Sequence, residues 1–205
     1  MKRFYVVNYE PDGIGSPYYL GGNYDPEEWE FDIDDPNPLD IKINRKHSLS
    51  LTDPEIKNID FDFYTPDPTI VSKEFLALCN EQKVPFKAIP FDISLARGKK
   101  QEKEYSIFIP ATHVALLDIE NSVAEIEKIL ETGENKINPI FPPNFVYAKI
   151  EKFAINEVQT ASLFQCIEIR QLVCTNEFKI EALSRNLKGL KFVPIDEQFR
   201  FDPWS

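Results

Sequence analysis

A strand–helix–strand pattern that occurs twice constrains the fold of this chain more than any other feature. The segment Ile-Val-Ser-Lys-Glu-Phe at residues 70–75 is matched by Val-Cys-Thr-Asn-Glu-Phe at residues 173–178. In each copy a hydroxyl residue, Ser72 or Thr175, lies three positions before a phenylalanine. A hydroxyl oxygen so placed can accept a hydrogen bond from an amide in the first turn of a helix. Each segment therefore predicts a short strand that leads into a capped helix.

The two copies also leave their helices in similar ways. Lys-Ala-Ile-Pro-Phe-Asp at residues 87–92 is similar to Lys-Phe-Val-Pro-Ile-Asp at residues 191–196. The offset between the copies is 103 residues at the start and 104 at the end. One residue is therefore inserted in the second copy, and we assign it to Gly189 as a helix-stopping residue. We interpret the pair as two related units. The alternative is that both segments share only the punctuation common to strand–helix–strand units.

Runs of β-forming residues predict strands through much of the remaining chain. We expect strands at residues 4–9, 29–33, 59–64, 86–91, 105–109, 114–118, 145–155 and 162–170. Ser-Val-Ala-Glu at residues 122–125 fits a capping box and predicts a helix that ends near Gly133, although the alternation of glutamate and isoleucine there also suits a strand. Together these elements predict an α+β fold, with a strand-rich mixed sheet and two similar strand–capped helix–strand units.

The first third of the chain differs from the remainder. Residues 1–68 are dense in Pro, Gly, Asp and Asn, which predicts a loop-rich segment. They hold 15 acidic and 6 basic residues, against 19 and 17 in residues 69–205, in a chain whose net charge is −11. We therefore distinguish an acidic N-terminal segment, residues 1–68, from an α+β scaffold with the repeat, residues 69–205. We expect both to belong to one continuous domain, residues 1–205.

The charge pattern indicates which partners the chain can bind. Ten carboxylates and no lysine or arginine lie between Phe4 and Ile41. Such a field repels nucleic acids and anionic membranes and attracts basic proteins. No apolar run reaches the roughly 7–15 residues of a signal peptide or the ~20 of a membrane helix. Cys79, Cys166 and Cys174 sit in apolar stretches, as reduced core thiols do. We expect a cytoplasmic protein that binds neither nucleic acid nor membrane.

Motifs for catalysis and for cofactor binding are missing from the sequence. The two histidines, His47 and His113, lack the spacing of a zinc site, and there is no Gly-x-Ser-x-Gly nucleophile elbow. Gly-Ile-Gly at residues 13–15 lacks the third glycine and the Lys-Ser/Thr pair of a phosphate-binding loop. We predict no catalytic residue, no metal ligand and no cofactor, and hence no enzyme. The alternative is a metal-dependent enzyme that uses the carboxylates of residues 25–35 or 60–67.

An acidic and aromatic stretch is the candidate partner-binding site. If residues 29–33 form a strand, the acids share one side and Trp29, Phe31 and Ile33 share the other, which is also the pattern of a half-buried strand with a solvated outer face. Tyrosine and tryptophan often anchor protein interfaces, and clustered carboxylates steer a basic partner. The predicted contact residues are Tyr24, Glu27, Glu28, Trp29, Glu30, Asp32, Asp34 and Asp35.

Several short motifs resemble a bacterial protein family. They are Ile-Val-Ser-Lys at residues 70–73, Asp-Ile-Glu-Asn-Ser at 118–122, Ala-Ser-Leu-Phe at 161–164 before the second Val-Cys-Thr unit, and Leu-Lys-Gly-Leu-Lys-Phe at 187–192. Over roughly residues 60–196 the chain is similar to a family, long labelled as of unknown function, that is grouped with the immunity proteins of polymorphic toxin systems. The resemblance implies a small cytoplasmic antidote that binds and blocks a cognate toxin. It implies no catalytic residue and transfers no contact residue by position.

The acidic segment suggests what such a toxin would present to its inhibitor. Toxins that attack nucleic acids have basic active-site surfaces, which carboxylates and aromatic side chains can cover. The first sixty or so residues resemble the family least, so we expect partner-specific contacts there. The remaining alternative is a protein–protein adaptor that has no toxin as its partner.

Overall fold

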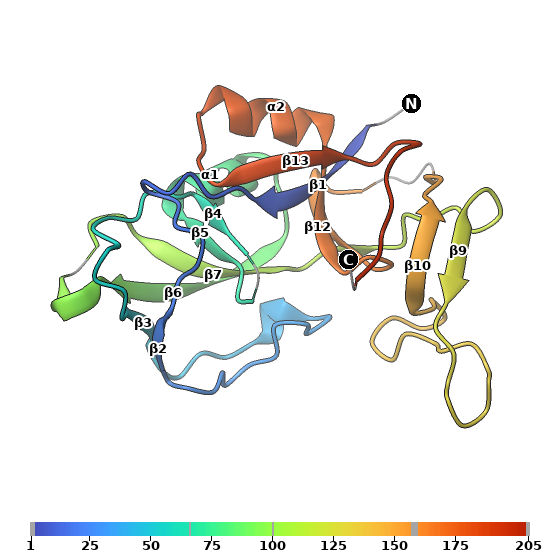
Figure 1. Cartoon of the computed structure of the whole chain (residues 1–205), viewed down its shortest axis with the longest axis horizontal. Helices are drawn as coiled ribbons and strands as arrows, with labels where there is room; N and C mark the ends of the chain where they lie inside the picture. The colour runs from blue at the N-terminus through green and yellow to red at the C-terminus, as the bar shows by residue number, and fades with distance from the viewer. Residues whose placement is uncertain (1–2, 66, 100, 157–159, 204–205) are drawn as a thin grey trace.

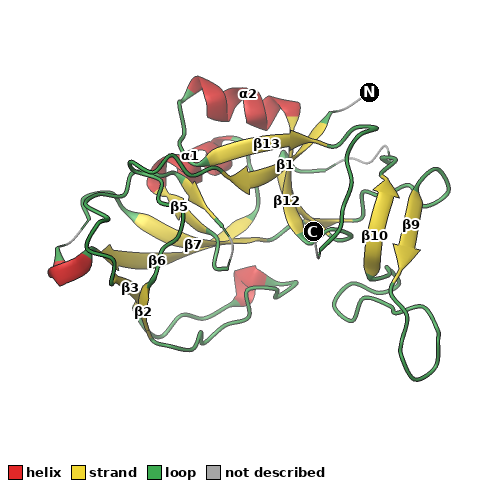
Figure 2. Ribbon diagram, viewed as in Figure 1, coloured by secondary structure: helices red, strands yellow, loops and turns green. Residues whose placement is uncertain are grey.

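The fold is described by a computed structural model that covers residues 3–65, 67–99, 101–156 and 160–203. Its α-helices are α1 (Lys73–Glu81) and α2 (Asn176–Ser184), and its short 3-10 helices are η1 (Pro38–Asp40) and η2 (Ala96–Gly98). Its strands are β1 (Phe4–Tyr9), β2 (Gly22–Asp25), β3 (His47–Leu51), β4 (Phe63–Tyr64), β5 (Ile70–Ser72), β6 (Phe86–Ser94), β7 (Tyr105–Pro110), β8 (His113–Val114), β9 (Val123–Ile126), β10 (Tyr147–Lys152), β11 (Leu163–Cys166), β12 (Gln171–Thr175) and β13 (Leu190–Pro194). Strands predominate, and the predicted α+β class is confirmed (Figures 1 and 2).

The strands of the described residues form three sheets, where the sequence predicted one. A six-stranded sheet has the order β2-β3-β6-β7-β5-β4, and a five-stranded sheet has the order β13-β1-β12-β11-β8. The pairs β3–β6 and β8–β11 are parallel, so both sheets are mixed. Strands β9 and β10 form a separate antiparallel pair, which stands at one end of the long axis of the molecule in Figure 1.

The two strand–helix–strand units have matching helix caps. The units are β5-α1-β6 and β12-α2-β13, and each helix has nine residues. The hydroxyl oxygen of Ser72 accepts a hydrogen bond from the amide of Phe75 at 3.2 Å, and that of Thr175 accepts one from the amide of Phe178 at 3.4 Å. The hydroxyl residues that the sequence marked therefore cap both helices, and each satisfies an amide that has no partner within its helix.

The two helices also end alike, and neither ends at Gly189. Lys83 and Asn186 both adopt left-handed backbone conformations, with φ of 54° and 53°, two residues after the last helical residue. The assignment of Gly189 as a helix stop is therefore wrong. With φ at 81°, Gly189 lies so close to β4 that an added Cβ would be 2.4 Å from the carbonyl oxygen of Phe63. Its lack of a side chain permits this contact between the second unit and β4.

A third strand completes each unit. Strand β7 pairs antiparallel with both β5 and β6, and β1 pairs antiparallel with both β12 and β13. The registers agree, because Ser72 lies opposite Tyr105 as Thr175 lies opposite Phe4. Strand β7 follows its unit in the sequence, whereas β1 lies at the other end of the chain from its unit. The structural repeat therefore includes a strand that the repeated sequence motif does not reveal.

The helix predicted from residue 122 is wrong, and the alternative of a strand is right. Residues Val123–Ile126 form β9. The hydroxyl oxygen of Ser122 accepts a hydrogen bond from the amide of Ala154 at 2.9 Å, next to the end of β10. The serine that was expected to cap a helix instead joins two chain segments, and the glutamate–isoleucine alternation suits the pairing with β10. Of the strand predicted over residues 59–64, only Phe63–Tyr64 is formed.

The main core cluster lies between the two units. Both helices contribute to it, and Phe75 of α1 meets Phe178 of α2 with ring centroids 5.9 Å apart in an edge-to-face arrangement. The three cysteines are buried and unpaired, as expected for core thiols, and burial raises the pKa of each thiol. Within the described residues, neither helix has the length and hydropathy that a membrane span requires.

Candidate partner-binding site

The two aromatic residues predicted as anchors pack against their own sheet. The ring centroid of Trp29 lies 5.4 Å from that of Tyr24, 5.6 Å from those of Phe31 and His47, and 6.3 Å from that of Phe91 on β6. Trp29 and Tyr24 are half-buried against the core cluster beneath the six-stranded sheet. They are therefore held rigidly, and only part of each ring faces solvent.

The strand predicted at residues 29–33 is wrong, since this stretch is a loop. The carboxylate of Asp32 accepts a hydrogen bond from the amide of Asp34 at 2.9 Å, and the carboxylate of Asp35 accepts one from the amide of Asn37 at 2.7 Å. These side chains bind backbone groups that a neighbouring strand would otherwise bind, and so they favour turns. Sequence alternation alone did not distinguish this aspartate-rich loop from an edge strand.

Glu30 has a structural role within the loop. Its carboxylate accepts hydrogen bonds from the amides of Asn44 at 3.0 Å and Arg45 at 2.9 Å, and it lies 3.3 Å from Nε2 of buried His47. The amide of Arg45 contributes most to holding the pKa of Glu30 below its usual range. Glu30 thus joins the acidic loop to the segment before β3, and this role limits what it can offer to a partner.

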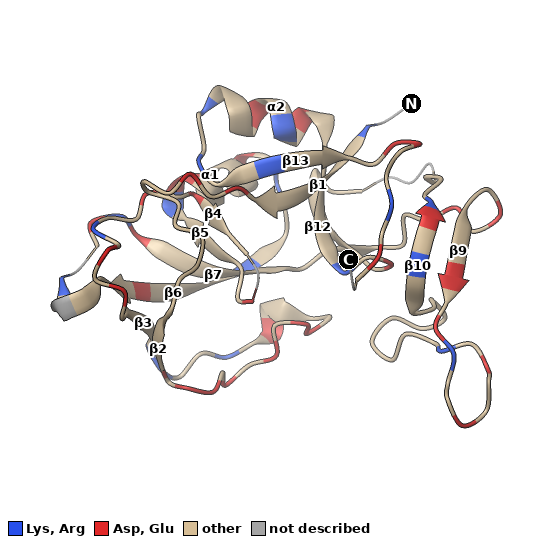
Figure 3. Ribbon diagram, in the orientation of Figure 1, with Lys and Arg blue, Asp and Glu red and all other residues tan. Residues whose placement is uncertain are grey.

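The other acids of the loop differ in whether their carboxylates bind groups of the same molecule. Asp34 forms an ion pair with Arg170, at 2.6 Å, and so joins the loop to the turn between β11 and β12. Glu27 and Glu28 are exposed and form no hydrogen bond or ion pair with any described residue. Acidic residues follow one another along this loop in Figure 3. Glu27 and Glu28 are therefore the carboxylates most available to a binding partner.

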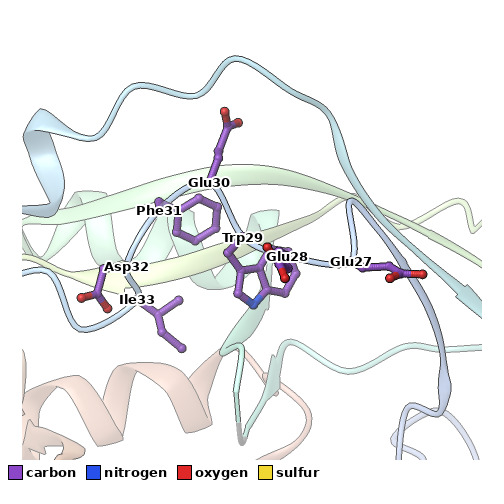
Figure 4. Close-up of a pocket in the computed structure, with 7 residues that line it drawn as sticks. All are labelled: Glu27, Glu28, Trp29, Glu30, Phe31, Asp32 and Ile33. Atoms are coloured by element: carbon purple, nitrogen blue, oxygen red, sulfur yellow. The ribbon is translucent and has the colours of Figure 1, made fainter.

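The loop surrounds an open, shallow depression rather than a cleft. Its volume is about 750 Å³, and it is lined by residues 27–33 alone. Figure 4 shows the carboxylates of Glu27, Glu30 and Asp32 pointing in different directions. Carboxylates that diverge in this way cannot converge on one ion, whereas an open acidic surface can face a protein partner.

The residues required by the metal-enzyme alternative are not brought together. Among the residues that the structure describes, no three His, Cys, Asp or Glu side chains gather where they could hold a metal ion. The ammonium group of Lys103 lies 3.2 Å from the carboxylate of Asp60 and 2.7 Å from that of Asp62. His113 is half-buried, and burial lowers its pKa. The carboxylates of residues 60–62 therefore form a lysine-paired structural cluster.

The comparison with known families identifies the class of this protein as that of an immunity protein. The model of a family described as Immunity protein 43 matches residues 27–201. The chain belongs to the Immunity protein 43 family. A search of curated proteins found no match. The matched region begins at Glu27, well before residue 60, where the short motifs placed its start. The acidic loop thus lies inside the family region, which extends further toward the N-terminus than the short motifs indicated.

Proposed function

We propose that this protein neutralises a cognate toxin in the cytoplasm by binding a basic surface of the toxin and covering it. Family membership supports a non-enzymatic inhibitor that binds a toxin. The observation that carries the finer proposal is the acidic loop, where Glu27 and Glu28 have no hydrogen-bond or ion-pair partner among the described residues and lie beside two firmly held aromatic rings. Unpaired carboxylates beside rigid aromatic side chains are suited to a basic protein surface.

The predicted contact residues take different roles in this proposal. Glu27 and Glu28 supply attraction to the toxin, and Tyr24 and Trp29 supply the apolar edge of the contact. Glu30 and Asp34 hold the loop in shape through Arg45 and Arg170. Asp32 and Asp35 stabilise its turns and add to its charge. A preorganised loop loses little conformational freedom when it binds, and this favours affinity.

The charge of the chain favours a toxin with a cationic cleft, such as a nuclease. A nuclease must attract phosphates, so the surface around its active site is basic. An inhibitor with a net charge of −11, concentrated in residues 1–68, is drawn to that surface and repels the nucleic acid that competes for it. Neutralisation then requires only that the bound inhibitor blocks access to the cleft. We propose that this chain binds neither nucleic acid nor membrane.

The electrostatic part of the proposal predicts a change in association rate. The double variant Glu27→Lys/Glu28→Lys should associate with the toxin domain about tenfold more slowly at low salt, with a shallower salt dependence, because exposed charges act mainly on the encounter. Stopped-flow fluorescence at several salt concentrations measures both quantities. The control Glu55→Lys/Glu102→Lys reverses the same number of exposed charges outside the loop. Equal slowing in both variants would show that net charge, and not this loop, guides association.

The immunity role itself is tested by protection in cells. The toxin domain is taken from the reading frame adjacent to the gene for this chain and expressed in a bacterial host with and without it. We expect the chain to restore growth and to co-purify with the toxin domain. Growth arrest despite soluble chain would contradict neutralisation. Co-purification without restored growth would favour an adaptor over an inhibitor.

A further inference from the structure

A projecting arm carries several exposed apolar residues. We define the arm as residues 118–154. A β-bridge between Leu117 and Ile155, the residues on either side of this segment, closes its base. It consists of β9, β10 and the connection between them, and it extends beyond the two larger sheets in Figure 1. Leu130 near its tip is 96% exposed and Val123 on β9 is 53% exposed. Further exposed apolar residues of the arm are Ile119, Ile137 and Ile140.

The base of the arm is firmly anchored to the body. Tyr147 and Ile150 of β10 are buried in the core cluster behind the five-stranded sheet, and Ile126 of β9 packs against that cluster. The backbone of Ile150 also exchanges two hydrogen bonds with that of Phe201, at 2.8 and 2.9 Å. The position of β9 is therefore set by buried contacts, although most of β9 itself is exposed. A surface fixed in this way is preorganised for binding.

Strand β9 has an open edge. Among the described residues it pairs with β10 and with no other strand. Its residues Val123, Ala124 and Glu125 are all exposed, so neither face of this part of the strand is covered. An unpaired edge presents backbone amides and carbonyls to which another extended segment can pair, and natural proteins commonly protect such edges with lysine or proline. Strand β9 has neither residue, and its protection is limited to its length of four residues and to two irregularities of register in the pairing with β10.

The charge around β9 distinguishes between possible occupants of its edge. The arm, residues 118–154, holds seven acids and four lysines, and two of these lysines, Lys149 and Lys152, lie opposite β9 on β10. Two copies of the chain that paired through β9 would bring two such segments together, and like charges across paired strands are destabilising. A basic extended segment would instead be attracted by Glu125 and by the acids that flank β9. Charge complementarity thus favours a different, basic partner over a second copy.

We propose that the edge of β9 receives an extended, basic segment of the cognate toxin as an added strand, with Val123 and Leu130 as apolar contacts. This inference rests on the proposed function and adds a second contact surface to it. The arm and the acidic loop approach each other at His113. The ring of Phe141 lies 4.5 Å from that of His113, and Asp34 acts on the pKa of the same histidine.

Hydrogen exchange tests the added strand without any substitution. The probe is the toxin domain encoded next to the gene for this chain, and the amides of β9 are followed with and without it. We expect slower exchange across residues 123–126 in the complex, because an added strand hydrogen-bonds to backbone amides at the open edge. Binding with unchanged exchange in β9 overturns this proposal and leaves the immunity role intact. If the toxin domain does not bind at all, both proposals fail.

A matched pair of variants tests the chemistry of the contact. Val123→Lys/Glu125→Lys replaces one exposed apolar residue and one acid on β9, and it should weaken toxin binding at least tenfold, as judged by calorimetry. Ile180→Lys/Glu102→Lys makes the same changes at exposed positions outside the arm and should bind as the wild type does. Thermal unfolding verifies that both variants are folded. Equal affinities of the two variants for the toxin domain overturn the proposal. The proposal is also overturned if light scattering shows that the wild-type chain is a dimer and that Val123→Lys converts it to a monomer.

Discussion

Replacing Phe178 with alanine is expected to lower the free energy of unfolding by about 4 kcal/mol. The ring is fully buried and lies between α1 and α2, in edge-to-face contact with Phe75. Its removal deletes buried apolar area and leaves a cavity that two helices and two sheets cannot easily close. Urea denaturation measures the loss. Leu183→Ala on the same helix, where the side chain is 53% exposed, is the control and should change stability by less than about 0.5 kcal/mol.

The same contact predicts that the two phenylalanines are energetically coupled. Phe75 occupies in α1 the position that Phe178 occupies in α2, so Phe75→Ala should cost a similar amount. The double variant should differ from the sum of the single losses by about 1 kcal/mol, since the pair contact can be lost only once. Strict additivity would contradict a direct contact between the two units at this point.

Replacing Asp62 with alanine is expected to cost about 3 kcal/mol. The side chain is almost completely buried and joins several parts of the molecule. Its carboxylate accepts hydrogen bonds from the hydroxyl of Ser72 at 2.6 Å and from the amide of Lys188 at 2.7 Å, and it lies 2.7 Å from Nζ of Lys103. Alanine leaves three donors without this acceptor, one of them the hydroxyl that caps α1. Thermal and urea unfolding measure the effect.

Asp60 provides the matched control for this prediction. It also contacts Lys103 and Lys188, but its side chain is 41% exposed, against 6% for that of Asp62. Solvent screens exposed ion pairs, so Asp60→Ala should cost less than about 1 kcal/mol. Similar losses for the two variants would indicate that the lysine pairing matters more than the buried hydrogen bonds.

The parts of the fold that the sequence predicted best are those determined by local contacts. The caps at Ser72 and Thr175 depend on amides three residues away, and both were predicted correctly. The place of β1 beside β12 and β13 depends on pairing between opposite ends of the chain, for which the sequence has no local signal. At residue 122 two local patterns competed, and the amide of distant Ala154 decides in favour of the strand.

The candidate site illustrates the same limit. The sequence predicted which residues make up the site, but it did not predict which of the acids form hydrogen bonds or ion pairs within the molecule. The carboxylate of Glu30 binds backbone amides more than ten residues away, and that of Asp34 binds Arg170 in the turn between β11 and β12. Glu27 and Glu28, by contrast, form no hydrogen bond or ion pair with the residues that the structure describes. Which of these acids contact a partner stays a prediction.

The position of β1 has a consequence for how the chain is made. The unit β5-α1-β6 and its third strand β7 are contiguous, so this unit can assemble as soon as it is synthesised. Of the described strands β1 leaves the ribosome first, whereas its neighbours β12 and β13 leave it last. During that interval both edges of this apolar strand are unpaired. We therefore expect β1 to be the segment that a chaperone binds during synthesis.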